Sequence, residues 1–231
     1  MRTGPLAAAA LLAACAGAST PPAGSWIHPS FGPGQLEGDV VVVLPIGAVA
    51  LPEGAPDSLA GALALRAGEA LATALQAGGA ARMAIRPSEA IAELASLSAT
   101  DVAALYAPLT AAILDPARGG EIPPDAASRW RGAAERTEGR YFLVPRSLSI
   151  ERLEPLRVRA GLDAWLVDAP AARILWHAPL SAVNPHAPSG AAADVYAAAL
   201  EDAIEAVAGT LATRLARLAR TGSDDLEAAT P

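Results

Sequence analysis

The sequence contains no lysine and only one cysteine, Cys15, among its 231 residues. Without lysine the chain has no phosphate-loop lysine, no Schiff-base lysine and no Ser-x-x-Lys catalytic pair. Without a second cysteine it has no internal disulfide, no CxxC redox pair and no multi-thiolate zinc site. The motifs GxSxG and HExxH are also missing. These absences exclude several common classes of enzyme and metal site.

Aromatic residues make up only 4% of the chain, whereas hydrophobic residues make up 52%, so we expect a core of Ala, Leu, Val and Ile. All 17 basic residues are arginines and stand against 24 acidic residues, which gives a formal net charge of −7. An acidic chain without a basic cluster is not expected to bind nucleic acid, because such binding relies on Lys and Arg neutralising phosphates. Electrostatic attraction to anionic lipids is not expected either.

Residues 1–14 are predicted to be an export signal. They combine Arg2 with an apolar run from Leu6 to Ala14, which is too short for a transmembrane helix of about 20 residues. The signal ends in Leu12-Ala13-Ala14-Cys15, which resembles the lipobox of bacterial lipoproteins. This resemblance implies that the Cys15 thiol takes a diacylglyceryl group and that, after cleavage, Cys15 becomes an acylated amino terminus, carrying fatty acids such as palmitate.

The alternative for this segment is an ordinary secretory signal that is cleaved beyond Cys15. It would leave an exported chain with a single thiol and no partner for it, so lipidation is the preferred interpretation. Two or three acyl chains would hold the protein permanently, since each buried CH₂ contributes about 0.8 kcal/mol. The next residue is Ala16 rather than aspartate, which in familiar lipoproteins of two-membraned bacteria is compatible with transfer to the outer membrane.

Residues 15–38 are predicted to be the acylated cysteine followed by a tether rich in Pro and Gly. Such a tether spans roughly 25 Å as a flexible coil and about 70 Å if it is polyproline-like. Its bulky residues Trp26, Ile27 and Phe31 are expected to dock on the protein's own domain rather than on a partner.

Residues 39–220 are predicted to form a single periplasmic α/β domain, in which residues 98–138 are a helical elaboration between two strands. Residues 221–231 are polar and are expected to be a disordered tail. Strands are predicted at 40–44, 80–85, 140–150, 156–168 and 173–183. Helices are predicted at 58–77, from Pro87 with Ser88 as cap to Leu94, from a capping box at Ser98 and Asp101 through Ile113, at 125–137 and at 189–219.

The last two predicted strands alternate, with Leu156 to Leu166 on the core side of one strand and Ile174 to Leu180 on that of the next. They are expected to form an antiparallel hairpin through the turn at 168–172. Pro145 makes the preceding strand an edge strand or a bulged strand. The order β-α-β, helices, β-β-β-α therefore predicts an α+β sandwich with a mixed sheet of about five strands and a long C-terminal helix that packs on the sheet.

Three short phrases resemble the CsgG, LpoB and TolB amino-terminal group of envelope proteins. They are Val40-Val-Val-Val-Leu-Pro45, Arg140-Tyr-Phe-Leu-Val144 and the hairpin Leu162-Asp-Ala-Trp-Leu-Val-Asp168 with Arg173-Ile-Leu-Trp176. In that group a "VLP" strand opens the domain and an "lvD...gxilW" hairpin precedes the last helix. The resemblance covers about residues 39–220 and implies a periplasmic accessory or adaptor domain without enzymatic activity.

One predicted surface is a candidate partner interface. Trp165 and His177 share the face of the hairpin that also carries Arg157, Arg159 and Asp163, and an exposed tryptophan beside arginines is typical of an interface hot spot. The other interpretation is that the elaboration at 98–138 covers this face, so that these residues are simply packed. The sequence leaves both open.

Catalytic and metal-binding alternatives have little support. A metal site would have to recruit His177 and His186 with Asp168 or Asp194, and a triad would need Ser181, His177 and Asp168, but no spacing brings these sets together. We therefore expect no metal, no cofactor and no catalytic residue.

The resulting hypothesis is a lipid-anchored periplasmic adaptor of the bacterial outer membrane that binds another envelope component, as assembly factor, regulator or scaffold. The alternatives are a subunit of a CsgG-like secretion assembly and a periplasmic hydrolase. A homo-oligomer stays open, and the partner cannot be named from the sequence.

Overall fold

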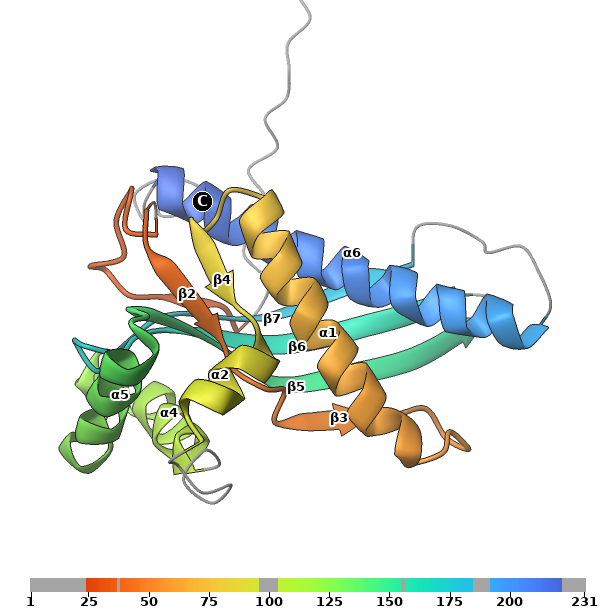
Figure 1. The fold of residues 1–231 in the computed structure, drawn as a ribbon, viewed down its shortest axis with the longest axis horizontal. Helices are drawn as coiled ribbons and strands as arrows, with labels where there is room; N and C mark the ends of the chain where they lie inside the picture. Colours follow the sequence, from red (N-terminus) through yellow and green to blue (C-terminus); the bar gives the residue numbers. More distant parts are fainter. Residues whose placement is uncertain (1–23, 37, 96–103, 155–156, 185–191, 222–231) are drawn as a thin grey trace, which may run out of the picture.

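The computed structural model describes residues 24–36, 38–95, 104–154, 157–184 and 192–221. The signal, Cys15, the capping residues Ser98, Asp101 and Ser189, and the tail lie outside these ranges. The described residues form one seven-stranded mixed sheet with helices on both faces (Figure 1). The predicted α+β sandwich is thus confirmed.

The elements agree closely with those predicted. The strands are β1 (Trp26–Ile27), β2 (Val40–Val43), β3 (Ala48–Ala50), β4 (Met83–Ile85), β5 (Tyr141–Glu154), β6 (Arg157–Asp168) and β7 (Arg173–Val183). The helices are α1 (Ser58–Ala77), α2 (Pro87–Glu93), α4 (Tyr106–Leu114), the 3-10 turn η1 (Pro116–Arg118), α5 (Pro124–Thr137) and α6 (Ala192–Thr221). The sequence did not predict β1 and β3, which are only two and three residues long.

The strand order is β1-β7-β6-β5-β2-β4, and β3 also pairs with β5. Strands β5, β6 and β7 form an antiparallel meander, as predicted for the last two, whereas β2 is parallel to both β4 and β5. The parallel pairs are joined through helices, since a parallel connection needs a crossover. The sheet is therefore mixed.

Two helix ends show how local sequence sets the element boundaries. Helix α1 begins at Ser58 and ends before Gly78, whose N–H donates to the Ala74 carbonyl over 2.8 Å. In α2 the predicted cap, Ser88, is wrong. The N-cap is Arg86, because Pro87 at the first helical position holds its predecessor extended and Glu89 accepts a hydrogen bond from the Arg86 N–H over 3.1 Å.

Each face of the sheet has its own hydrophobic core. Helices α1 and α6 cover one face, and α2, α4 and α5 cover part of the other. The predicted stripe of α6 packs on the sheet and on α1, through side chains such as Leu200, Ile204, Leu211 and Leu215, all buried. No helix among the described ranges is long and apolar enough to cross a bilayer.

Two bulges modify the predicted strand faces. Pro145 lies in the central strand β5, not at an edge, and the register shifts between Pro145 and Ser147, so the bulge alternative is the correct one. In β7 the register shifts beside Leu175, so that Trp176 stays in the core with α6 as predicted, but Ile174 joins the opposite core. A bulge adds one residue and therefore reverses the face of those beyond it.

The segment 24–36, which we call the strap, packs on the domain and is not part of a free tether. Trp26 and Ile27 pair with His177 and Trp176 of β7, and Phe31 and Leu36 are completely buried. Docking of Trp26, Ile27 and Phe31 on their own domain is as expected. The boundary predicted between tether and domain, at residue 38, is therefore too late. The free energy gained by burying these bulky side chains exceeds the conformational entropy that the segment would keep as a solvated tether.

Candidate functional site

Three of the predicted interface residues meet at one point of the sheet. The Nε2 atom of His177 lies 2.6 Å from Oδ1 of Asp163, and the His177 and Trp165 rings make an edge-to-face contact at 5.0 Å. The β5 bulge adds Arg146, whose guanidinium lies 5.0 Å from the centre of the Trp165 ring and 3.7 Å from Oδ2 of Asp163. Because a carboxylate only accepts, Nε2 of His177 donates in this pair.

The structure decides whether Trp165 is an exposed interface residue or is packed beneath the helical elaboration. Its side chain is only 2% exposed and belongs to the core that includes α4 and α5, so the packed interpretation holds. His177 Nδ1 is also buried, and it has no hydrogen-bond partner among the described atoms. Trp165 is thus a core residue in this chain and not an exposed hot spot.

The pKa of the Asp163 carboxyl reflects two opposed effects. Burial raises this pKa, but the hydrogen bond from His177 and the nearby positive charge of Arg146 outweigh burial and hold it below the usual value. Asp163 is therefore ionised at neutral pH. It joins strands β6 and β7 and the bulged Arg146 through one carboxylate.

Arg157 and Arg159 lie apart from this cluster, toward the far end of β6. Arg159 forms an ion pair with Glu151 at 2.7 Å and Arg157 one with Glu154 at 3.9 Å, both exposed. The structure therefore separates the five predicted interface residues into two groups: buried Trp165 with the partly buried Asp163 and His177, and the exposed Arg157 and Arg159. Partner binding by the exposed arginines stays a prediction.

The catalytic and metal alternatives are not assembled. His177 pairs with Asp163, whereas Asp168 pairs with Arg140 at 2.9 Å. Ser181 lies four residues beyond His177 on β7, roughly 13 Å along a strand. The side chains of His186 and Asp194 lie outside the described residues. In the part that is described, no three His, Cys, Asp or Glu residues are placed to hold a metal ion.

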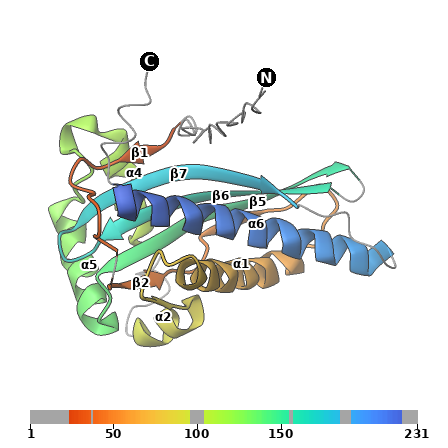
Figure 2. The same ribbon diagram turned by 90° about the horizontal axis from the view of Figure 1, so that it is seen from above.

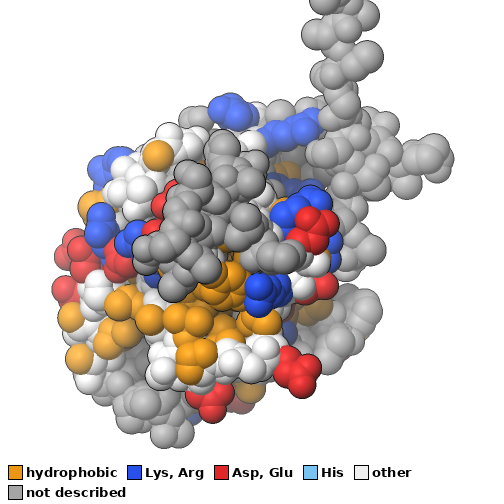
Figure 3. Space-filling view, turned by 90° about the vertical axis from the view of Figure 1, so that its right-hand side faces the viewer, with side chains coloured by type: hydrophobic (Ala, Val, Ile, Leu, Met, Phe, Trp, Pro, Cys, Tyr) orange, Lys and Arg blue, Asp and Glu red, His pale blue; other side chains and the backbone are white. Residues whose placement is uncertain are grey.

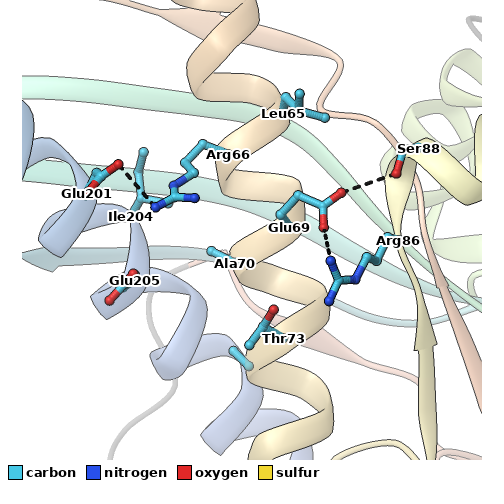
Figure 4. Close-up of a pocket in the computed structure, with 11 residues that line it drawn as sticks. Leu65, Arg66, Glu69, Ala70, Thr73, Arg86, Ser88, Glu201, Ile204 and Glu205 are labelled. Carbon is cyan, nitrogen blue, oxygen red and sulfur yellow. Dashed lines mark hydrogen bonds and ion pairs between the residues drawn. The ribbon is translucent and has the colours of Figure 1, made fainter.

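A groove of about 760 Å³ follows the outer side of α1, between α6 and the start of α2 (Figure 4). Ala70, Ala74 and Ile204 line it together with charged residues of both signs. Arg66 joins α1 to Glu201 of α6 at 3.2 Å. On the other side, Glu69 accepts from Arg86 at 3.1 Å and from Ser88 at 3.4 Å.

This groove was not predicted from the sequence. Arg66 has the helical spacing of the apolar residues of α1, such as Leu59 and Leu63, but its side chain is 58% exposed and lines the groove. Leu65 beside it is 55% exposed, and the other exposed large apolar side chains among the described residues are Met83 on β4 and Ile91 on α2. The signal available in the sequence was Leu65, a large apolar residue directly before Arg66.

A second apolar surface lies at the end of the molecule where β3, the start of α1 and the start of α6 meet (Figure 3). Partly buried apolar side chains of these elements include Val49, Leu59 and Tyr196. The Arg152 guanidinium lies 5.4 Å from the centre of the Tyr196 ring. The Arg152 guanidinium therefore lies over part of this patch.

No protein-family model and no curated protein sequence matches the chain. Several solved structures are similar. One is a PelC dodecamer from Paraburkholderia phytofirmans, with 18% identity over 83% of this chain and 96% of that chain, at a TM-score of 0.41. Lipoprotein GNA1162 from Neisseria meningitidis has 12% identity over 66% of this chain and 86% of that one, at a TM-score of 0.40.

The C-terminal domain of LpoB from Salmonella enterica has 18% identity over 65% of this chain and 87% of that chain, at a TM-score of 0.37. A lipoprotein is thus among the chains that this protein is similar to. At TM-scores below 0.5 these similarities assign no function, so the proposals below are argued from the residues of this chain.

Proposed function

We propose that this chain is a lipid-anchored, non-catalytic adaptor on the periplasmic side of the bacterial outer membrane, which binds another envelope component. The observation that carries the proposal is the sequence Leu12-Ala13-Ala14-Cys15, which ends a short export signal and contains the chain's only cysteine. A single cysteine at this position can serve as a lipid attachment site, whereas it cannot form a disulfide within the chain.

A hydrolase would need an accessible base, and the geometry of His177 argues against that role. Nε2 is already bonded to Asp163, and Nδ1 is buried. His177 therefore has no free imidazole nitrogen that could accept a proton from a substrate. Its Nε2 contacts the carboxylate of Asp163, in the position where a catalytic nucleophile would have to lie. For the second alternative, a subunit of a CsgG-like secretion assembly, no contact or surface of the described residues favours it over an adaptor.

The groove beside α1 is the surface that we propose for the partner. Apolar side chains along its length and charged residues at its rim match the composition of protein interfaces. Leu65 projects from α1 in Figure 4 and is more than half exposed. We infer a partner protein that supplies an apolar side chain for Leu65 and charges of both signs for Arg66 and Glu69.

Lipidation is tested first, by mass spectrometry of the mature protein from its native envelope. We expect an amino-terminal Cys15 carrying acyl chains, in the outer-membrane fraction of a density gradient. Cys15→Ser should leave the protein uncleaved or soluble, whereas the matched variant Ser19→Cys, which adds a thiol outside the lipobox, should be acylated at Cys15 as before. An unmodified Cys15 thiol, or a mature end beyond it, would refute the proposal.

Partner binding is tested with a photocrosslinking residue placed at position 65 and, for comparison, at position 159. We expect a specific envelope protein to be captured from position 65. The captured protein, once purified, should bind the wild type and bind Leu65→Glu at least tenfold more weakly. Capture from position 159 instead would move the interface to the exposed arginines, and equal binding by Leu65→Glu would exclude the groove.

A further inference from the structure

The strap determines where the anchor meets the domain. Trp26 pairs with His177 in an antiparallel arrangement, and a Cβ at Gly24 would lie 3.8 Å from Cγ of Pro179. The described chain thus begins at the outer edge of β7, beside Pro179.

In the described part of the chain, the sheet beside Gly24 has helices on only one of its faces. Figure 2 shows α4 and α5 at one end, and β5, β6 and β7 extending beyond them with α6 and α1 on the opposite face. Strand alternation places one set of side chains on the uncovered side, which we call the open face. Its exposed members are Ser149, Glu151, Arg157, Arg159, Pro179 and Ser181.

The anchor is short because the strap is docked. Nine Cα–Cα steps separate Cys15 from Gly24, and at about 3.5 Å per step they reach at most roughly 32 Å. As a flexible chain the same segment averages about 17 Å. Helix α6, with 30 residues, is about 45 Å long. The acylated cysteine therefore keeps Gly24 at a distance from the bilayer that is shorter than the length of α6.

The charges of the open face suit a neutral headgroup layer. Glu151 and Arg159 form one ion pair and Glu154 and Arg157 another, so that opposite charges alternate without a net excess. The exposed large apolar side chains of the described chain, Leu65 among them, lie on α1, β4 and α2, and none is on the open face. This face can lie along lipid headgroups without inserting into them.

We propose that, in the anchored protein, the open face lies toward a zwitterionic phospholipid surface and the groove beside α1 faces away from it. The proposal rests on the lipidation of Cys15 and adds an orientation to the proposed function. It also gives the strap a role: docking of Trp26 and Phe31 turns a 23-residue tether into a short one, which presents the groove to a periplasmic partner.

The test measures resonance energy transfer to acceptor-labelled headgroups in nanodiscs of phosphatidylethanolamine and phosphatidylcholine. In the acylated full-length protein the Cys15 sulfur carries the lipid and cannot react with a thiol label. A fluorescent donor attached to one introduced cysteine therefore labels a single site. Ser149→Cys and Ser181→Cys report on the open face, and Thr73→Cys reports on the groove; all three positions are exposed. We expect transfer from positions 149 and 181 to be at least twofold more efficient than from position 73.

A spacer of ten Gly and Ser residues inserted after Ala18 is the matched control, because it lengthens the anchor and leaves the domain unchanged. It should reduce the difference between the two faces. Equal transfer from all three positions, greater transfer from position 73, or burial of the open face by a second copy would each overturn the orientation. Mass spectrometry of the same sample separates these results from failure of lipidation, since only acylated protein enters the comparison.

Discussion

The indole of Trp26 lies against the backbone of Gly120, in the space that a side chain at position 120 would need. Gly120 has φ of +81°, its carbonyl accepts from the Ile174 N–H over 2.9 Å, and a Cβ there would also lie 3.1 Å from the Ile174 carbonyl oxygen. This contact joins the strap to the loop after η1 and to β7. It is a point at which the strap is held to the rest of the fold.

Gly120→Ala is therefore expected to loosen the strap. The substitution combines an unfavourable positive φ with displacement of Trp26, and together these cost about 2–4 kcal/mol of unfolding free energy. Gly119→Ala is the matched control, because Gly119 also has a positive φ, +54°, but nothing within 4 Å of its Cβ position. It should cost only about 1 kcal/mol. Urea denaturation measures both, and equal losses would contradict the role of Trp26.

The elements that the sequence predicts best are those with strong local signals. Helix α1 lies within its predicted bounds because Gly78 and Gly79 end it, and the β6–β7 hairpin follows from clean alternation. The bulge beside Leu175 could not be predicted, because it depends on pairing across strands and not on local sequence. Docking of Trp26, Ile27 and Phe31 was predicted, but the extent of the strap was not, because its burial depends on a surface formed by β7 and the end of α6.

The candidate site was predicted only in part. Asp163, Trp165 and His177 do meet on one face, as alternation requires, but the cover over Trp165 comes from helices distant in sequence. The groove depends on how α1 packs beside α6, which periodicity does not give. Arg66 illustrates the difference, since its spacing fits a buried stripe while its charge is satisfied at the surface by Glu201.

Two glycines of α1 should respond to alanine with opposite signs. A Cβ at Gly68 would lie 2.6 Å from Cγ of Pro87, so Gly68→Ala must push α1 from α2 and should cost about 1–3 kcal/mol. Gly61 has nothing within 4 Å, and Gly61→Ala should stabilise the helix by about 0.5–1 kcal/mol. Thermal and urea unfolding of the two variants test this. Stabilisation by both would show that Gly68 is not a packing requirement.

The Asp163 carboxylate should make stability depend on acid pH. Since its folded-state pKa is lowered, its contribution is fully present above the unfolded pKa of about 3.9 and is lost as pH falls through the folded pKa. Asp163→Asn removes this contribution. The wild type should exceed Asp163→Asn in unfolding free energy at pH 6, and the excess should shrink as pH falls below about 4.

Urea unfolding of both proteins across this pH range measures the effect. Glu151→Gln is the control for loss of a surface carboxylate, because its pair with Arg159 is exposed and should be worth less than about 1 kcal/mol at pH 6. An excess for Asp163 that stays constant down to pH 2.5 would show that the carboxylate is not stabilised by its charge.

Trp165→Ala distinguishes a core residue from an interface residue. The side chain is almost fully buried between Arg146, His177 and the core beneath α4 and α5, so its removal should cost about 3–5 kcal/mol, a large part of the roughly 5–15 kcal/mol that stabilises a domain of this kind. Ser149→Ala, on the exposed part of the same sheet face, should change stability by no more than about 0.5 kcal/mol. A Trp165→Ala protein with unchanged melting temperature but reduced partner capture would restore Trp165 as an interface residue, because only an exposed side chain can be removed without leaving a cavity.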